Sequence, residues 1–284
     1  MAEAYAFYEG AFGKAVVLQS RADLVPHAHS ESQIAFWLGG THAQAQVGDE
    51  LVQYGQDVGL ATNAFQCHDM TLLEGNGPAI FLVFMISSQW LNQRREATGQ
   101  PFVFPSPRIP IDPALRQACW RVLDLILSPQ RQSSLMDEEV EKLITAAIAA
   151  TANADPERAR GLGPPTLDHR LRAAITIMRE NVSEKITVEE IAAKVGLSRA
   201  HIFNLFRDQL NTTPQVFWSA VRVEEAMRRL ITEGAPLTWV ALDLGFSAPS
   251  NFSRFFKEHT GVSPSTFRRA ASGNLPATVT GLSL

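Results

Sequence analysis

The sequence predicts an α+β protein of two domains: an N-terminal small β-barrel with a pair of helices, and a C-terminal all-helical domain. Short apolar runs broken by turn residues fill the stretch from about Lys14 to Met85. A helical segment at 187–217 recurs about 50 positions later, and a polar segment rich in Gly and Pro, 153–165, separates the two regions. A chain of 284 residues is long enough to build two separate cores.

The N-terminal runs predict the β-domain. They follow one another at roughly ten-residue spacing, which is typical of an antiparallel sandwich or small barrel. Gly39-Gly40 and Gly48-Asp49 supply turns between them. We therefore expect short strands that leave room for one small ligand at the mouth of the barrel.

Histidines cluster in this region. The spacing of His27 and His29 resembles the first motif of the cupins, in which two histidines and a later carboxylate hold a metal, and His68 is a candidate third ligand. Gln33 stands where the carboxylate is expected, and the segment 63–68 lacks the proline of the second cupin motif. We therefore expect a small-molecule pocket with no metal and no other cofactor. The residues expected to line it are His27, His29, Gln33, Trp37 and His68.

Helical periodicity follows the β-region. A short helix is expected over 89–99, and apolar side chains then recur at three- and four-residue steps over 115–127 and again over 140–148. Two helices with such stripes must bury them. Packing on the barrel and a self-complementary dimer interface both satisfy this requirement.

The C-terminal region contains a duplicated unit. Ile202 corresponds to Phe252 and Phe206 to Phe256, both at an offset of 50 positions. In the first copy Thr187 begins a short helix, with Glu190 placed to complete a capping box, and Gly196 provides the turn before a second helix. Helix, glycine turn and helix together match the helix-turn-helix pattern.

The second helix of each copy has one apolar face and one face available for contact. In the first copy Ile202, Leu205 and Phe206 share the core side, and in the second Phe252, Phe255 and Phe256 do. Arg, Asn and Ser side chains on the other side suit base edges and phosphates in a major groove. The expected DNA-binding residues are Arg199, Ala200, Phe203, Asn204, Arg207, Ser250, Asn251, Ser253, Arg254 and Lys257, and Arg254 is the best candidate for reading a guanine.

A predicted helix over 214–233 separates the two copies. At 1.5 Å per residue it would be ~30 Å long, close to the ~34 Å between successive major grooves on one face of DNA. Residues 1–165 carry 11 Lys+Arg and 18 Asp+Glu (net −7), and residues 166–284 carry 14 and 11 (net +3), which together return the total of −4. The helical domain alone is cationic, in agreement with a nucleic-acid partner.

At these residues the sequence resembles the AraC/XylS transcription regulators. The resemblance rests on Gly245-Phe246, on Phe252-Ser253-Arg254-Phe255-Phe256-Lys257 and on the run Gly261-Val262-Ser263-Pro264-Ser265-Thr266-Phe267-Arg268. It implies a cupin-like effector-binding and dimerisation domain over 1–152 and a double helix-turn-helix domain over 166–270, and the polar, Gly- and Pro-rich composition of 153–165 predicts the linker between them. The implied partners are double-stranded promoter DNA, a small-molecule effector, RNA polymerase and a second copy of the chain.

The remaining expectations concern location and chemistry. Cys67 and Cys119 form no disulfide framework, and the longest apolar run, 79–86, is too short to span a bilayer, so we expect a cytoplasmic protein that is not embedded in a membrane. No nucleophile–base–acid set is present, so no enzyme is expected. Two alternatives stay open: a metal-dependent cupin enzyme with a DNA-binding appendage, and a DNA-binding dimer without an effector. The tail over 271–284 is expected to be disordered.

Overall fold

The structure is a computed structural model that describes residues 3–74, 77–99, 102–128, 133–161, 167–184, 186–210, 212–232 and 235–271. The strands are β1 (Glu3–Gly10), β2 (Gly13–Ser20), β3 (Leu24–His27), β4 (Ser32–Gly40), β5 (Ala43–Val47), β6 (Glu50–Gln53), β7 (Val58–Thr62), β8 (His68–Leu72), β9 (Ala79–Ile86) and β10 (Arg108–Pro110). The helices are α1 (Ser88–Thr98), α2 (Pro113–Leu127), α3 (Ser133–Ala154), α4 (Pro156–Gly161), α5 (His169–Glu180), α6 (Val188–Lys194), α7 (Arg199–Leu210), α8 (Pro214–Thr232), α9 (Leu237–Asp243), α10 (Pro249–Thr260) and α11 (Pro264–Ala271). The predicted tail, 271–284, lies outside the described residues except for Ala271, which ends α11.

The strands form two antiparallel sheets. One has the order β1-β2-β9-β4-β7-β10 and the other β3-β8-β5-β6. The prediction of a β-sheet domain followed by an all-helical one is confirmed. The hydrogen-bond ladders of the described residues give two sheets and no closed barrel.

Alternation along the strands divides the larger sheet into two faces. In β4, Ile34 and Phe36 point to the core shared with the helices, whereas Ala35 belongs to the core between the two sheets. In β9, Phe84 faces the core shared with the helices, and Phe81 faces the core between the two sheets. Because side chains alternate with a period of two, every second residue of β2, β4 and β9 faces the space between the sheets.

Two strands, β1 and β10, were not predicted. β1 pairs with β2 from Glu3 opposite Gln19 to Gly10 opposite Gly13. Its run of small and aromatic residues has no polar alternation to mark it as a strand, because it has a neighbour over both faces: Ala6 and Tyr8 join the helix-side core, and Phe7 reaches α11. β10 lies within a segment predicted to be a loop, where it pairs with β7.

Helices α1, α2 and α3 lie on the outer face of the six-stranded sheet. Leu115, Val122 and Ile126 of α2, with Val140 and the rest of the α3 stripe, are buried in one core with the strands. Both apolar stripes therefore pack on the β-domain. The buried side chains of these stripes are covered within the chain, so they are not free to contact a second copy.

The segment between the domains is partly helical. α3 continues to Ala154, and α4 occupies Pro156–Gly161, so the first part of the segment predicted to be a linker is helical. The Pro and Gly residues that motivated it lie mostly at 161–165, and 162–166 fall outside the described residues. Six residues of polar sequence are too few for helical periodicity to be read.

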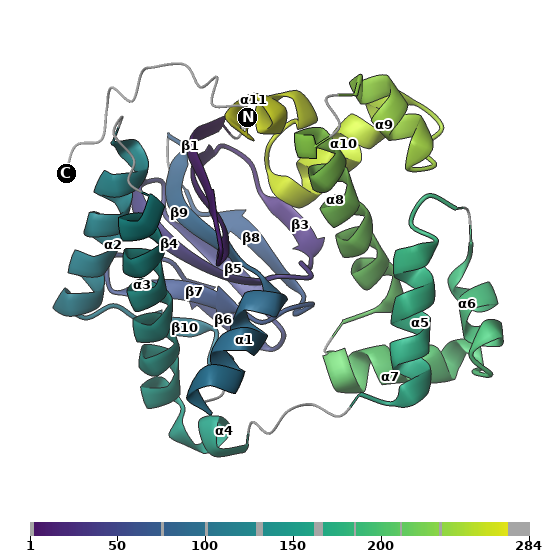
Figure 1. Cartoon of the computed structure of the whole chain (residues 1–284), viewed down its shortest axis with the longest axis horizontal. Helices are drawn as coiled ribbons and strands as arrows, with labels where there is room; N and C mark the ends of the chain where they lie inside the picture. Colours follow the sequence, from purple (N-terminus) through teal and green to yellow (C-terminus); the bar gives the residue numbers. More distant parts are fainter. Residues whose placement is uncertain are drawn as a thin grey trace.

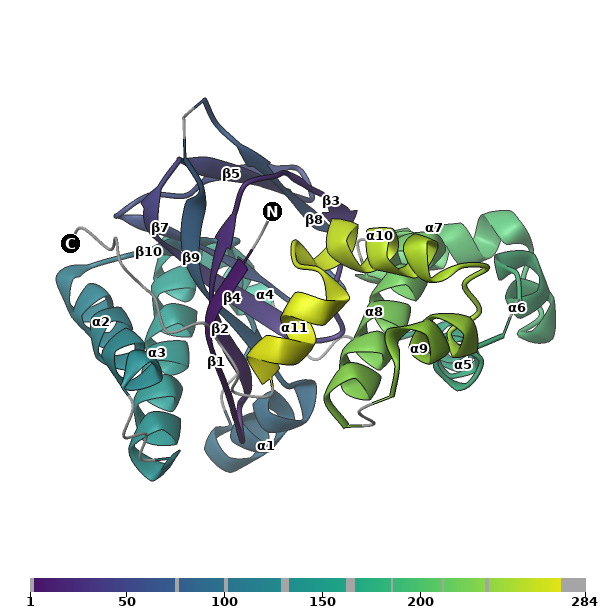
Figure 2. The same ribbon diagram turned by 90° about the horizontal axis from the view of Figure 1, so that it is seen from above.

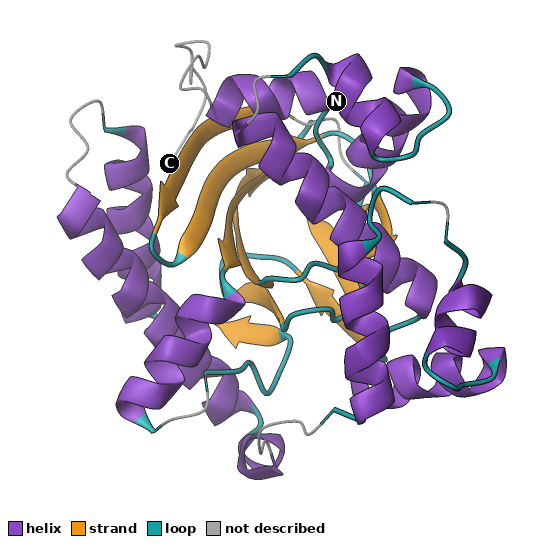
Figure 3. Ribbon diagram, turned by 45° about the vertical axis from the view of Figure 1, so that its right-hand side comes forward, coloured by secondary structure: helices purple, strands orange, loops and turns teal. Residues whose placement is uncertain are grey.

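The helical domain has two cores joined by α8. Phe217 and Val221 belong to the first core, with α5, α6 and α7, whereas Ala226 and Leu230 belong to the second, with α9, α10 and α11. Figure 1 and Figure 2 place the β-domain between the α2–α3 pair and these helices. Figure 3 shows helices on both sides of the strands. Among the described residues, no helix is both long and apolar enough to cross a membrane.

The predicted turn chemistry is present. Thr187 accepts from the Glu190 amide, and the Glu190 side chain accepts from the Thr187 amide, which completes the capping box. Gly196 and Gly245 end the first helix of each unit with φ of 71° and 76°, a left-handed conformation that favours glycine.

Candidate DNA interface and interdomain cavity

Helix α7 presents the face that the sequence predicts. Ile202, Leu205 and Phe206 are buried in the first core. Asn204 and Arg207 are exposed on the other side, as are the predicted Ala200 and Arg199 at the start of the helix. An amide and a guanidinium on one exposed helix face can hydrogen-bond to base edges or phosphates.

Two residues of this face are already engaged. Arg199 forms an ion pair with Glu189 of α6, and its guanidinium lies 4.8 Å from the centre of the Phe203 ring. Phe203 is half-buried and packs against the first core. Its large apolar side chain therefore has partners without DNA, which weakens the reason for placing it in a groove.

Helix α10 presents the second face. Phe252 and Phe256 are buried, whereas Ser250, Arg254 and Lys257 are exposed. Two further predicted residues are half-buried: Asn251, which donates from its side chain to Ser247 Oγ, and Ser253. The prediction that Phe255 is buried is wrong. Phe255 lies at the edge of the core, where its ring packs on Phe246 and His259. One side of the ring therefore stays partly exposed.

The spacer helix α8 packs into the cores of both helix-turn-helix units and so connects them. α8 has 19 residues, and one side chain attaches it to the turn of the second unit. The guanidinium of Arg222 donates to the Leu244 carbonyl oxygen at 2.6 Å and lies 4.4 Å from the centre of the Phe246 ring. Arg222 therefore holds the turn that precedes α10 against α8.

A cavity lies between the β-domain and the second helix-turn-helix unit. The space amounts to about 1060 Å³, part of it open to solvent, and most of its walls are apolar. Val16, Phe81 and Met85 come from the inner face of the six-stranded sheet, and Met227 and Phe267 come from α8 and α11. An apolar hollow with a few polar groups gathered in one part of its wall is typical of a small-molecule site.

Four of the five predicted pocket residues meet in this cavity. His27, His29, Gln33 and His68 line it, and Gln33 hydrogen-bonds to His29. Trp37 does not join them. It lies farther along β4, where its ring stacks on His42 with centroids 4.7 Å apart and its indole N–H donates to the Thr41 carbonyl oxygen.

The three pocket histidines are neutral at neutral pH. Burial is the main cause that lowers the pKa of each, and the other histidines of the cluster lower it further for His27 and His29. Burial also lowers the pKa of His259, which reaches the cavity from the C-terminal end of α10. The histidines therefore contribute neutral hydrogen-bonding groups to the cavity, which Lys14 and Asp69 also line.

Sequence reasoning missed the residues that other elements contribute. Lys14 of β2 lines the cavity and lies 4.0 Å from Glu31, and His259 and Thr260 line it from the end of α10. None belongs to a motif that includes the pocket histidines. Their shared location follows from how the domains pack, which no local pattern records.

Aromatic contacts connect the β-domain to both helix-turn-helix units. Phe65, in the loop before β8, stacks on Phe217 of α8 with centroids 4.3 Å apart. Phe7 of β1 meets Phe267 of α11 edge to face with centroids 6.4 Å apart. Each unit therefore has its own contact with the domain that lines the cavity.

Known proteins resemble the chain in both regions. Residues 191–270 match the family model described as a helix-turn-helix domain. The raffinose operon transcriptional regulatory protein RafR of Pediococcus pentosaceus is 32% identical over 97 residues, covering 34% of this chain and 35% of that protein. The arabinose operon regulatory protein of Escherichia coli is 32% identical over 105 residues, covering 37% and 36%. The alignments thus span about a third of each relative.

The fold of the whole chain is similar to that of a solved structure. An apo form of ToxT from Vibrio cholerae superposes with a TM-score of 0.62 over 95% of this chain and 97% of that one, at 10% sequence identity. At that identity the likeness shows the fold alone. It covers the two-sheet domain as well as the helices.

These observations define the class of the protein. It is a two-domain protein whose C-terminal domain carries two helix-turn-helix units on one spacer helix. That domain matches the helix-turn-helix family model and the corresponding part of the operon regulators named above, which supports the resemblance to the AraC/XylS family that the sequence motifs carry. The matched relatives are transcription regulators, in agreement with the expectation that the chain is not an enzyme.

Proposed function

We propose that the protein is a ligand-responsive transcription regulator that binds promoter DNA through α7 and α10 in successive major grooves. The observation that carries the proposal is the composition of the cavity wall. His259 and Thr260, at the end of α10, line the same space as the inner face of the β-domain. A small molecule in that space contacts the sheet and the second recognition helix at once.

Contact with both domains gives a ligand the means to change the arrangement of the helices. A ligand shifts a conformational equilibrium only by its difference in affinity for the two states. Any arrangement that moves α10 away from β3 removes part of the cavity wall, so the two states must differ in affinity. The Phe65–Phe217 and Phe7–Phe267 contacts are the points at which the two units would loosen.

The lining favours an apolar effector with one polar or acidic end. Apolar side chains form most of the wall, and the polar groups gather at the histidine cluster and at Lys14. One structure of ToxT holds an unsaturated fatty acid. The same class of molecule suits this cavity, because its chain would meet the apolar wall and its carboxylate would meet Lys14 or a histidine.

Sequence readout is assigned mainly to α10. Ser250, Arg254 and Lys257 are exposed on one side of that helix, and Arg254 has the bidentate geometry that suits guanine. In α7, Asn204 and Arg207 are the free members of the predicted set, since Arg199 is paired with Glu189. Ala200, Phe203, Asn251 and Ser253 complete the proposed interface as neighbouring contacts.

The proposal includes the remaining expectations about partners. It places the protein in the cytoplasm with its promoter DNA, as a homodimer that contacts RNA polymerase. The dimer contact must use surfaces other than the buried stripes of α2 and α3. A DNA-binding dimer without an effector is the alternative, and it differs in one respect, since no small molecule would alter its DNA affinity.

Fluorescence anisotropy of the full chain tests the proposal. The labelled DNA is the region upstream of its own gene, with a scrambled duplex of equal composition as control, at ~0.15 M salt. We expect at least tenfold tighter binding to the upstream region, and a change in that affinity when oleate is added below its micelle concentration. Equal affinity for both duplexes would refute specific DNA binding. Specific binding that neither oleate nor other long-chain carboxylates alter would support the effector-independent alternative.

A further inference from the structure

We propose that His27, His29 and His68 bind one divalent transition-metal ion of the zinc type, with an open coordination position toward the interdomain cavity. The site stands independently of the regulatory function, because it rests on the geometry of these three side chains alone.

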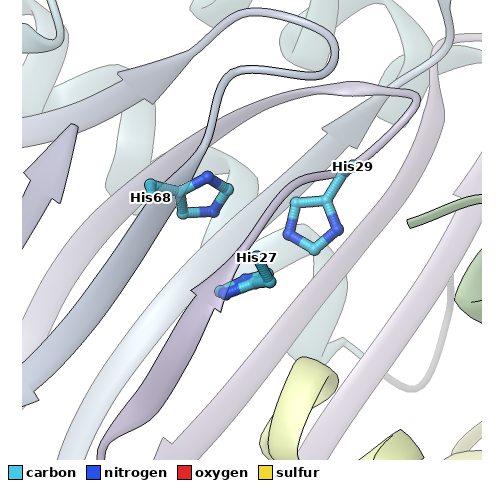
Figure 4. Close-up of side chains that lie close together, drawn as sticks. All are labelled: His27, His29 and His68. Carbon is cyan, nitrogen blue, oxygen red and sulfur yellow. The ribbon is translucent and has the colours of Figure 1, made fainter. Parts of the chain in front are cut away.

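The backbone brings the three imidazoles together. His27 ends β3 and His68 begins β8, and the two residues are direct partners in the antiparallel ladder. His29 follows two positions after His27 and turns its ring to the same side (Figure 4). Ring centroids lie 4.4 Å apart for His27 and His68, 4.8 Å for His27 and His29, and 5.1 Å for His29 and His68.

The nitrogen positions fit a shared ion after a small movement. One ring nitrogen from each residue lies within 4.8 Å of the other two. With metal–nitrogen bonds of about 2.0–2.1 Å, tetrahedral ligands lie roughly 3.3 Å from one another. Binding one ion would require the rings to move closer together by rotation about their side-chain bonds. Three neutral rings without an ion have no reason to approach further.

Hydrogen bonds already select the nitrogen that a metal would need. Nδ1 of His27 lies 2.7 Å from the Val25 carbonyl oxygen, and Nδ1 of His68 lies 2.9 Å from the Gln66 carbonyl oxygen. A carbonyl oxygen only accepts, so Nδ1 of each ring carries the proton and Nε2 keeps its lone pair. A backbone carbonyl behind the ring is the usual support of a metal-binding histidine.

One of these lone pairs has no partner. Nε2 of His68 is buried and makes no hydrogen bond within the described structure. A buried polar atom without a partner costs free energy, so a partner outside the protein is the simplest resolution.

The surroundings leave the remaining coordination position free. All three histidines line the cavity, so the fourth position of a tetrahedral ion faces the space where a small molecule would lie. Imidazole ligands suit zinc and its neighbours in the first transition row, whereas calcium and magnesium prefer oxygen. The weakness of the second cupin motif argued against a metal from the sequence. In the structure, the pairing of His27 with His68 in the ladder places the third imidazole beside the other two.

Cobalt(II) and zinc titrations of the full chain, prepared without a histidine tag and stripped with a chelator, test the site. We expect one equivalent of Co²⁺ to bind with visible absorption bands of a tetrahedral site, and one equivalent of Zn²⁺ to displace it. The thermal unfolding midpoint should rise with Zn²⁺. Elemental analysis should find about one metal per chain after gel filtration.

Two variants separate this site from other histidines. His29→Gln changes the half-buried member of the cluster, so it is the change least harmful to folding, and it should weaken Co²⁺ binding by roughly 100-fold or more. His42→Gln, an exposed histidine outside the cluster, should bind like the wild type. Circular dichroism checks the fold of each. The proposal is overturned if the wild type binds far less than one equivalent, or if His29→Gln binds as tightly as the wild type.

Discussion

The ring of Phe65 in the β-domain stacks on the ring of Phe217 in the spacer helix α8, with centroids 4.3 Å apart and an interplanar angle of 27°. Phe65 also has a φ of 63°, the one left-handed non-glycine residue in the described parts of the chain. Its amide donates to the His29 carbonyl oxygen at 2.6 Å. Phe65, one of the residues that join the two domains, is therefore hydrogen-bonded to the backbone of the histidine cluster.

Replacing Phe65 tests this connection. Phe65→Ala should uncouple the domains, because it removes the stack on Phe217 and the contact with Arg179, whose guanidinium lies 5.7 Å from the ring centre. We expect differential scanning calorimetry to show two transitions where the wild type shows one. Phe65→Gly removes the same ring and relieves the left-handed backbone, so it should be about 1 kcal/mol more stable than the alanine variant. One unchanged transition in both variants would contradict the coupling.

The capping box at the start of α6 gives a local prediction. Thr187→Ala removes the side chain that accepts from the Glu190 amide, at a cost of about 1 kcal/mol. Hydrogen exchange of the α6 amides should accelerate about fivefold as a result. Thr176→Ala, an exposed position inside α5, is the matched control and should leave exchange in its helix unchanged. Similar effects of the two changes would remove the role assigned to the cap.

The guanidinium of Arg222 should not be replaceable by an ammonium group. Arg222→Lys loses the planar contact with Phe246 and the short hydrogen bond to Leu244, at an expected cost of about 1–3 kcal/mol. Thermal unfolding should show a lower midpoint for the helical domain. Arg228→Lys changes an exposed arginine of the same helix that pairs with Glu225, and its midpoint should stay close to that of the wild type. Equal midpoints for the two variants would show that Arg222 is an ordinary surface charge.

The two thiols should react at different rates. Burial raises the pKa of Cys119 to about 12, and this thiol is closed off from solvent. Burial also raises the pKa of Cys67, but that residue is only half-buried, so a reagent can reach it. A thiol-specific reagent at pH 8 should therefore modify Cys67 first and Cys119 only when the β-domain unfolds. Immediate modification of both thiols in the native protein would show that the α2 core is open.

The sequence predicted those parts of the fold that local chemistry determines. Ile202 and Phe206, together with Phe252 and Phe256, repeat at fixed spacing because each helix buries one face, so both units were found. Phe255 departed from its repeat partner Leu205, because the edge of the second core is formed by Phe246 and His259. The strand β1 was missed because alternation disappears where both faces of a strand are covered.

The cavity was predicted only in part, because some of its wall is formed by residues that come together only when the two domains pack. His27, His29 and Gln33 lie within one short segment, and His68 was connected to them through a motif, so the sequence placed them together. Trp37 shares their strand face but lies too far along β4 to reach the cavity. Lys14, Met227 and His259 come from three other elements. Only the packing of the two domains brings them to the same wall.

A methylation-protection footprint on the upstream DNA tests the central claim most directly. Dimethyl sulfate reports guanine N7 in the major groove, so the account predicts two protected patches about one helical turn apart on one face of the duplex. Arg254→Ala should abolish protection of one guanine in one patch at a cost of roughly 1–3 kcal/mol in affinity, whereas Arg21→Ala, an exposed arginine of the β-domain, should leave both patches intact. A single patch, or a uniform weakening of protection in Arg254→Ala, would contradict the placement of α7 and α10 in successive grooves.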